Sequence, residues 1–309
     1  MTEDYTSHHA SPRWFPVSFS FGRDDARATF RGVIDEQGGA YGAEMQNTRF
    51  DSRFVPSGSG SRTPWYFIVC LIEGDLSVGS RSVSLGEVFV VPDKSLTAAG
   101  NKWQVVRSRS QNLRAALIRV RSDELREKAT GVDSFRPCSS TSFEAFDGLA
   151  AALAKSEFTR AATGVEPLIR GLEADGILSP RQNAHRRAST RSETFTQRLA
   201  AHVFPLLSEL VSRPMLVDAV ARAGVSERQF LRTMLRVQER FDLLDRGWRP
   251  SMVRWRATAA ALLCSYPQLT FEEVADLAGY SSTSAMHRGL RAFGLPTPGT
   301  IRDRTNNDA

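Results

Sequence analysis

Two segments in the C-terminal third of the chain share one pattern of apolar and polar positions. In residues 271–278 the apolar side chains recur at the spacing of one helix face, and acidic side chains occupy most of the positions between them. Thr270 and Glu273 stand three residues apart, which predicts a capping box at the start of this helix. Gly279 predicts its end, because glycine tolerates the left-handed backbone of a tight turn. A second helix is expected over 284–293, after serines that can cap it.

The same pattern occurs earlier in the chain. Residues 216–223 place small and apolar side chains before Gly224, and Ser226 with Gln229 forms a second predicted capping box. Two helices joined by such a turn are typical of a helix-turn-helix unit, whose second helix enters the DNA major groove. An ordinary helical hairpin is the alternative for either segment taken alone. Because the pattern is repeated, the helix-turn-helix interpretation is favoured.

Charge separates the two ends of the chain. Residues 180–309 contain 19 Arg, no Lys and 12 acidic residues, a net charge of +7, whereas residues 1–179 have a net charge of −1. A basic region joined to a near-neutral one is expected when only one domain meets phosphate groups. A solvated, arginine-rich surface is the alternative explanation of the same counts.

Residues 15–121 carry the signals of short strands, because β-branched and aromatic runs alternate with Gly, Asp and Ser turns. Many short strands with close turns predict an antiparallel barrel or sandwich. The strand expected over 112–122 should turn Arg114, Arg119 and Arg121 outward. Five aromatic residues are candidates either to line the interior or to pack its core: Trp65, Tyr66, Phe67, Phe89 and Trp103.

The period of the apolar pattern becomes helical after the strands. Residues 143–158 and 165–178 are amphipathic, and their leucines suit an antiparallel helix pair. Such a pair either joins a second copy of the chain or packs on its own strands. Polar and basic residues without apolar periodicity predict a linker over 179–192. The expected domains are therefore 1–178 and 193–309, and a helix over 193–212 opens the second.

Several motifs in order resemble the C-terminal domain of AraC-type transcriptional regulators. They are "AGVSERQFLRTM" (223–234), "RWRATAAALL" (254–263), "EEVADLAGYSSTSAMHRGLRAFG" (272–294), and Pro298 with Arg302. The pair "LIEGDLSVG" and "LGEVFVVP" is similar to the middle of a cupin-type β-barrel, the usual N-terminal sensor of this family. The fold class implied is α+β, with an N-terminal antiparallel cupin-like β-barrel followed by an all-α domain with two helix-turn-helix units.

The resemblance implies a sequence-specific DNA-binding transcriptional regulator, with an N-terminal barrel that senses a small molecule or forms dimers. Double-stranded DNA is the expected partner, and a small-molecule effector, RNA polymerase and a second copy of the chain are further candidates; the regulator is expected to be an activator. Arg pairs with guanine, Gln with adenine, and Ser and Thr with phosphates or bases. The predicted DNA-binding residues are Ser226, Arg228, Gln229, Arg232, Arg236, Ser282, Thr283, Ser284, His287, Arg288 and Arg291.

Other classes of function find little support in the sequence. The five histidines, at positions 8, 9, 185, 202 and 287, all lie outside the predicted strands, so neither a metal site nor a cofactor is expected in the barrel. Motifs of hydrolases, dinucleotide-binding folds and P-loops are missing, so an enzyme is not expected. The three cysteines are far apart, and the N-terminal residues do not resemble a secretion signal, which predicts a cytoplasmic protein without a membrane span. Two alternatives remain: a helical protein-interaction module fused to a metal-free β-barrel, and a cupin-like enzyme.

Overall fold

The computed structural model describes residues 15–23, 26–35, 38–46, 50–51, 65–92, 106–108, 110, 112–126, 135–180, 206, 209–241 and 247–307. The strands are β1 (Phe15–Arg23), β2 (Ala26–Asp35), β3 (Gly38–Gln46), β4 (Phe50–Asp51), β5 (Trp65–Glu73), β6 (Ser77–Val78), β7 (Arg81–Ser82), β8 (Glu87–Pro92), β9 (Val106–Ser108), β10 (Asn112–Arg121) and β11 (Phe135–Pro137). The helices are α1 (Ser140–Ala154), α2 (Phe158–Ala174), the short 3-10 helix η5 (Leu210–Ser212), α4 (Leu216–Ala223), α5 (Glu227–Phe241), α6 (Trp248–Cys264), α7 (Phe271–Leu277), α8 (Thr283–Ala292) and α9 (Pro298–Asn307).

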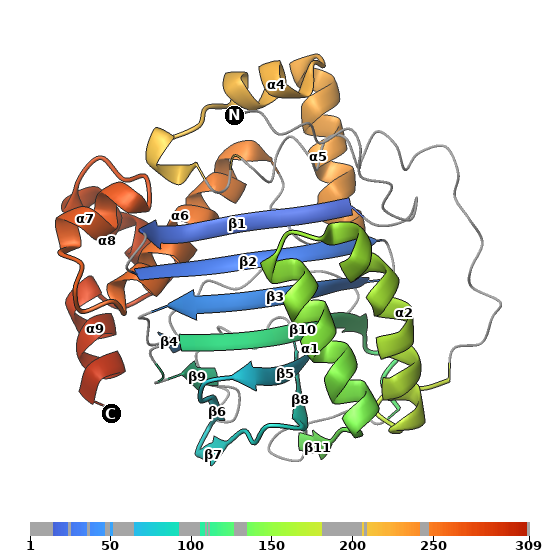
Figure 1. The fold of residues 1–309 in the computed structure, drawn as a ribbon. Helices are drawn as coiled ribbons and strands as arrows, with labels where there is room; N and C mark the ends of the chain where they lie inside the picture. The colour runs from blue at the N-terminus through green and yellow to red at the C-terminus, as the bar shows by residue number, and fades with distance from the viewer. Residues whose placement is uncertain are drawn as a thin grey trace.

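The strands form two antiparallel sheets (Figure 1). The larger sheet has seven strands in the order β1-β2-β3-β10-β5-β8-β11, and the smaller has four in the order β4-β9-β6-β7. The first three strands follow one another as a meander, and their register places Phe19 opposite Phe30. The predicted fold class, an N-terminal antiparallel β domain followed by helices, is confirmed.

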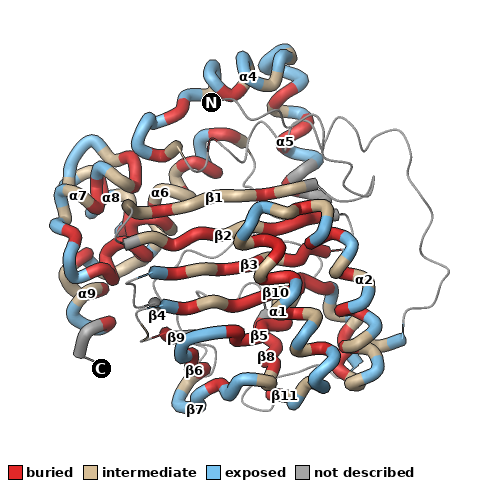
Figure 2. Tube along the Cα trace, in the orientation of Figure 1, coloured by how far each residue is buried: buried red, intermediate tan, exposed pale blue. Residues whose placement is uncertain are grey.

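Helices α1 and α2 cover one face of the larger sheet (Figures 1 and 2). Leu149 and Leu153 of α1, and Leu168 and Leu172 of α2, are buried in one cluster with side chains from that face. Gly42 in β3 makes the close approach of α1 feasible, because a Cβ there would lie 3.3 Å from Cβ of Leu153. The apolar side of the predicted helix pair therefore packs on its own sheet, and not on a second copy of the chain.

Two of the three arginines predicted to face outward from β10 do not do so. Arg114 lies under α1, where its guanidinium donates to Asp147 at 3.2 Å, and Arg119 is buried. Arg119 is only 2% exposed, and its guanidinium carbon lies 4.4 Å from the centroid of the Trp65 ring. Alternation along the strand sends Ile118 and Val120 toward the helices, so Arg119 must point to the opposite face, between the two sheets. Arg121, two residues further along, lies on the same face of the strand as Arg119 but is exposed because it stands at the strand end. The prediction failed because both faces of this central strand are covered.

The aromatic candidates separate in the same way. Phe67 and Phe89 pack in the cluster between the sheets, and Trp65 lies on that side beside Arg119. Tyr66 instead packs against the helix side, so it is not an interior residue. Trp103 lies outside the described residues.

The C-terminal helices form a second core around α6, whose buried residues include Ala257 and Ala260. Val17, Phe21 and Ile34 of the larger sheet belong to the same cluster. In Figure 1 the helices α4 and α5 lie beyond the β1 edge of that sheet, and α7 to α9 lie beside one end of its strands. Most of the predicted linker (179–192), and the first part of the helix predicted over 193–212, lie outside the described residues.

Truncating Leu153 should reveal how much the α1 contact stabilises the sheet. We expect Leu153→Ala to lower the free energy of unfolding by about 2–5 kcal/mol, because it leaves a cavity over Gly42. Glu144→Ala, an exposed site on the same helix, should change it by less than about 0.5 kcal/mol. Urea titrations followed by circular dichroism would measure both, and equal effects would contradict the packing described.

Candidate nucleic-acid interface

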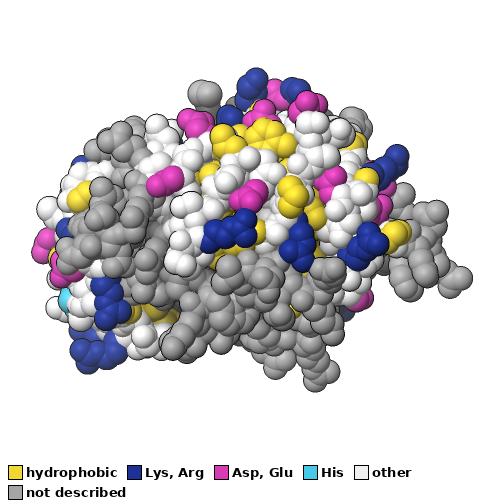
Figure 3. All heavy atoms as spheres, turned by 90° about the horizontal axis from the view of Figure 1, so that it is seen from below, with side chains coloured by type: hydrophobic (Ala, Val, Ile, Leu, Met, Phe, Trp, Pro, Cys, Tyr) yellow, Lys and Arg dark blue, Asp and Glu magenta, His cyan; other side chains and the backbone are white. Residues whose placement is uncertain are grey.

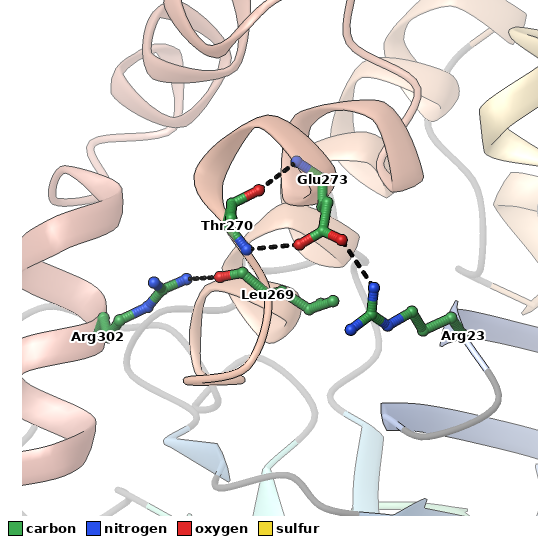
Figure 4. Close-up of polar contacts among 5 residues, drawn as sticks. All are labelled: Arg23, Leu269, Thr270, Glu273 and Arg302. Atoms are coloured by element: carbon green, nitrogen blue, oxygen red, sulfur yellow. Dashed lines mark hydrogen bonds and ion pairs between the residues drawn. The ribbon is translucent and has the colours of Figure 1, made fainter.

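The second unit begins with the predicted capping box (Figure 4). The hydroxyl of Thr270 accepts a hydrogen bond from the Glu273 amide at 3.2 Å, and the Glu273 carboxylate accepts one from the Thr270 amide at 2.7 Å. The bond from the Thr270 backbone is the main cause that holds the pKa of Glu273 below its ordinary value, and the charge of Arg23 contributes. Helix α7 therefore starts where the sequence predicts.

Arg302 ties the start of α7 to the two neighbouring helices. From α9 its guanidinium donates to the carbonyl of Leu269 at 2.8 Å, as Figure 4 shows, and to the carbonyl of Cys264, the last residue of α6, at 3.1 Å. It also lies 4.1 Å from the centroid of the Phe271 ring. A planar, permanently charged group suits this triple contact, because it can donate in two directions while it stacks.

The turn after α7 requires glycine for two independent reasons. Gly279 has φ +76°, in the left-handed region that L side chains rarely adopt. A Cβ at this position would also collide with the backbone carbonyl of Leu210 in η5. Nearby, Nη2 of Arg213 donates to the carbonyl of Tyr280 at 2.8 Å. The turn of the second unit is thus packed directly against the segment that precedes the first unit.

Helix α8 follows this turn and is capped by Ser282, whose hydroxyl accepts from the Ala285 amide at 3.2 Å. Met286 and Leu290 are buried and fix which side of the helix faces the core. The opposite side carries predicted site residues at helical spacing, and these are exposed: Ser284, His287, Arg288 and Arg291. Thr283, in the first turn, is partly buried.

The first unit repeats these features. Gly224 has φ +61°, but its surroundings are open, because no described atom lies within 4 Å of where a Cβ would stand. Ser226 accepts from the Gln229 amide at 3.3 Å, so it caps α5 as predicted. Phe230 and Met234 are buried, and the opposite side of α5 is exposed with its predicted residues: Arg228, Gln229, Arg232 and Arg236. Both second helices therefore present their predicted residues to solvent, apart from the partly buried Thr283.

A pair of charged groups outside the predicted set braces the first unit. Arg222 in α4 donates to both carboxylate oxygens of Glu209, at 2.9 and 2.7 Å. Like Arg213, Arg222 contacts a residue that is not its neighbour on a helix, so no local spacing could have indicated the contact.

Figure 3 shows basic and acidic side chains interspersed on one face, with dark-blue side chains also gathered at the end that carries the histidine.

Metal ligands, membrane spans and activated nucleophiles would indicate other kinds of site in the described residues. They contain no group of three His, Cys, Asp or Glu side chains that could hold a metal ion, and none of their helices is long and apolar enough to cross a membrane. Burial raises the pKa of Cys264 and that of Tyr280 to about 12, so both groups are neutral at neutral pH. Neither is therefore activated as a nucleophile or a base.

Three comparisons relate this arrangement to known proteins. No protein-family model and no curated protein matches the chain. Among solved structures, ToxT from Vibrio cholerae is 8% identical with a TM-score of 0.33, over 86% of this chain and 98% of that one. Unsaturated-fatty-acid-bound ToxT from strain SCE256 gives 8% and 0.33 over 97% and 98%. The AraC-like transcriptional activator CuxR gives 12% and 0.27, over 68% of this chain and 74% of that one.

One of these neighbours, CuxR, is an AraC-like transcriptional activator, of the family that the sequence motifs resemble. Identities this low say nothing of activity, and TM-scores below 0.5 give these neighbours no weight in assigning a function. The functional assignment therefore depends on the geometry of the helices themselves.

The two turn glycines provide a matched pair of substitutions. Gly224→Ala should cost about 1 kcal/mol, because it adds only the strain of a left-handed alanine. Gly279→Ala adds a collision with the Leu210 carbonyl and should cost at least about 2–3 kcal/mol. Thermal and urea unfolding of both variants would measure the difference. A Gly279→Ala protein as stable as the Gly224→Ala protein would show that the turn relaxes away from Leu210.

Proposed function

We propose that this protein is a sequence-specific, DNA-binding transcriptional regulator of the AraC type. The observation that carries the proposal is the pair of capped, solvent-facing helices α5 and α8, each preceded by a short helix and a left-handed glycine. Each buries its apolar side and exposes an arginine-bearing side. In a helix-turn-helix unit, this is the side that enters the major groove.

The chemistry of the exposed side chains indicates which of them can contact DNA bases and which can contact the DNA backbone. In α5, Arg228 can donate to both acceptors of a guanine and Gln229 can pair with adenine. In α8, Arg291 can contact guanine, while Ser284 and Thr283 can serve phosphates. Arg232 and Arg288 match positions that are commonly structural, or directed to the DNA backbone, in AraC-type regulators. We therefore propose that they contribute less to sequence discrimination.

The relative placement of the two units supports contact with one stretch of DNA. They share the core around α6, and the Gly279 turn packs on the η5 segment before the first unit. Two units held in this way would enter successive major grooves about 34 Å apart. The net charge of +7 over residues 180–309 favours the same partner, because phosphate contacts dominate affinity.

We further propose that the N-terminal sheets sense a small molecule or form dimers, with RNA polymerase as a later partner in the cytoplasm. The helix pair on the larger sheet uses its apolar side internally, so a dimer would have to use another surface. Calorimetry on the full chain with candidate effectors, followed by DNA titration with each effector, tests the sensing role. An effector that binds without changing DNA affinity would leave only dimerisation, since equal affinity for two states shifts neither.

Removing one arginine from each exposed helix tests the proposed function. Arg228→Ala and Arg291→Ala should each weaken DNA binding by about 1–3 kcal/mol at one guanine if they read a base, or uniformly with a shallower salt slope if they hold phosphate. Sequences selected from a random DNA pool at two salt concentrations, then mutated singly, would provide the measurement.

Arg170→Ala is the matched control, because Arg170 is an exposed helix arginine of α2, remote in sequence from both units. It should leave affinity unchanged. The proposal would be refuted if Arg228→Ala and Arg291→Ala are both folded and both bind DNA as tightly as the wild-type protein. Affinity for a protein partner that depends only weakly on salt would favour the interaction-module alternative.

A further inference from the structure

Strand β1, at the edge of the N-terminal sheet, is in direct contact with the helices that carry the second unit. Phe19 meets the Trp255 ring of α6 edge-on, with centroids 4.7 Å apart, and Phe21 lies 6.0 Å from the same ring. Phe30 of β2 stacks behind Phe19 at 5.1 Å. Val17 and Phe21 are buried in the core of the helical region itself.

A charged contact stands beside the rings. Nη1 of Arg23, the last residue of β1, lies 2.7 Å from Oε1 of Glu273, as Figure 4 shows. The other carboxylate oxygen of Glu273 is the one that accepts the Thr270 amide at the start of α7. One side chain therefore joins the N-terminal sheet to the first turn of the second helix-turn-helix unit.

The ion pair is the weaker part of this contact. Both partners of the ion pair are about two-fifths exposed, with side-chain values of 41% and 40%, and exposed pairs contribute little by themselves. The rings supply the apolar part, but Nε1 of Trp255 is buried and has no hydrogen-bond partner in the described structure, which opposes docking. Burial of Val17 and Phe21 therefore supplies most of the docking free energy, and the ion pair chiefly fixes how α7 lies against β1.

We propose that β1 is a positioning element for the second helix-turn-helix unit, so that the N-terminal domain controls DNA contact by α8 more than contact by α5. The inference rests on the proposed function. The ring stack acts on α6 and the ion pair acts on α7, and both of these helices pack on α8. With β1 docked, the predicted residues of α5 and most of those of α8 are exposed, so docking leaves them free to meet DNA.

Charge reversal at Arg23 tests this in the full-length chain. Arg23→Glu places two carboxylates together and should push the start of α7 away from β1. Arg31→Glu places two carboxylates together at the Arg31–Glu44 pair, 3.0 Å apart within the sheet, and is the control. Glu273→Gln removes the repulsion and keeps the cap, because a Gln oxygen can still accept from Thr270. Arg23→Lys keeps the positive charge. Phe19→Ala removes the ring contact independently.

The readouts are affinity and a hydroxyl-radical footprint on a selected DNA with two half-sites, assigned by comparison with Arg228→Ala and Arg291→Ala. We expect Arg23→Glu to weaken binding roughly five- to twentyfold, with protection lost over the α8 half-site. Phe19→Ala should lose the same half-site, Arg23→Glu with Glu273→Gln should recover it, and Arg23→Lys and Arg31→Glu should bind like wild type. Circular dichroism and melting curves would establish that each variant is folded.

The outcomes distinguish a failure of the proposed function from a failure of the positioning role. Wild-type protein that binds no DNA would refute the proposed function and this inference with it. The positioning role alone would be refuted if the wild-type protein binds DNA and the two variants Arg23→Glu and Phe19→Ala behave otherwise than expected. They would either leave the footprint intact or reduce protection of both half-sites equally. Failure of Glu273→Gln to restore Arg23→Glu would likewise show that the effect does not pass through α7.

Discussion

The approach of the Gly279 backbone to the carbonyl of Leu210 is the constraint on which the helical region depends. At this point the turn inside the second unit and the segment before the first unit touch with no side chain between them. The left-handed φ of Gly279 and the missing Cβ are both needed, and only glycine supplies them together. Arg213 closes the same junction with its bond to the Tyr280 carbonyl. The separation of α5 from α8 is therefore set by backbone contact as well as by α6.

Arginine has two separate uses in this region. Those of α5 and α8 that face solvent remain available for phosphates and bases. Others hold backbone carbonyls or carboxylates across the fold: Arg213, Arg222 and Arg302. Because guanidinium donates in a fixed plane and in several directions, one residue type can serve both uses. The number of arginines available to contact DNA is therefore smaller than the net positive charge of this region suggests.

The docking of β1 on α6 and α7 means that the two regions of the chain are not independent in this structure. Phe21 is part of the helical core although it comes from the N-terminal sheet, and Glu273 serves both a helix cap and a contact with Arg23. A change in the sheet that moves its edge strand would reach α7 through these residues. Coupling between the two regions then needs only this one contact, provided that it has two arrangements and that each region favours one of them.

Local sequence determined the parts of this protein whose physics is local. The Thr270–Glu273 box, the Ser226 cap and the left-handed glycines were all predictable, because capping and turn geometry involve residues within four positions of one another. The sides of α5 and α8 that face solvent followed from helical period. Tertiary structure alone decided the rest. Arg119 is buried because a second sheet covers a face that strand alternation could not identify as covered. The partners of Arg23 and Arg302 lie far along the chain, and long-range pairing leaves no periodic signal in sequence.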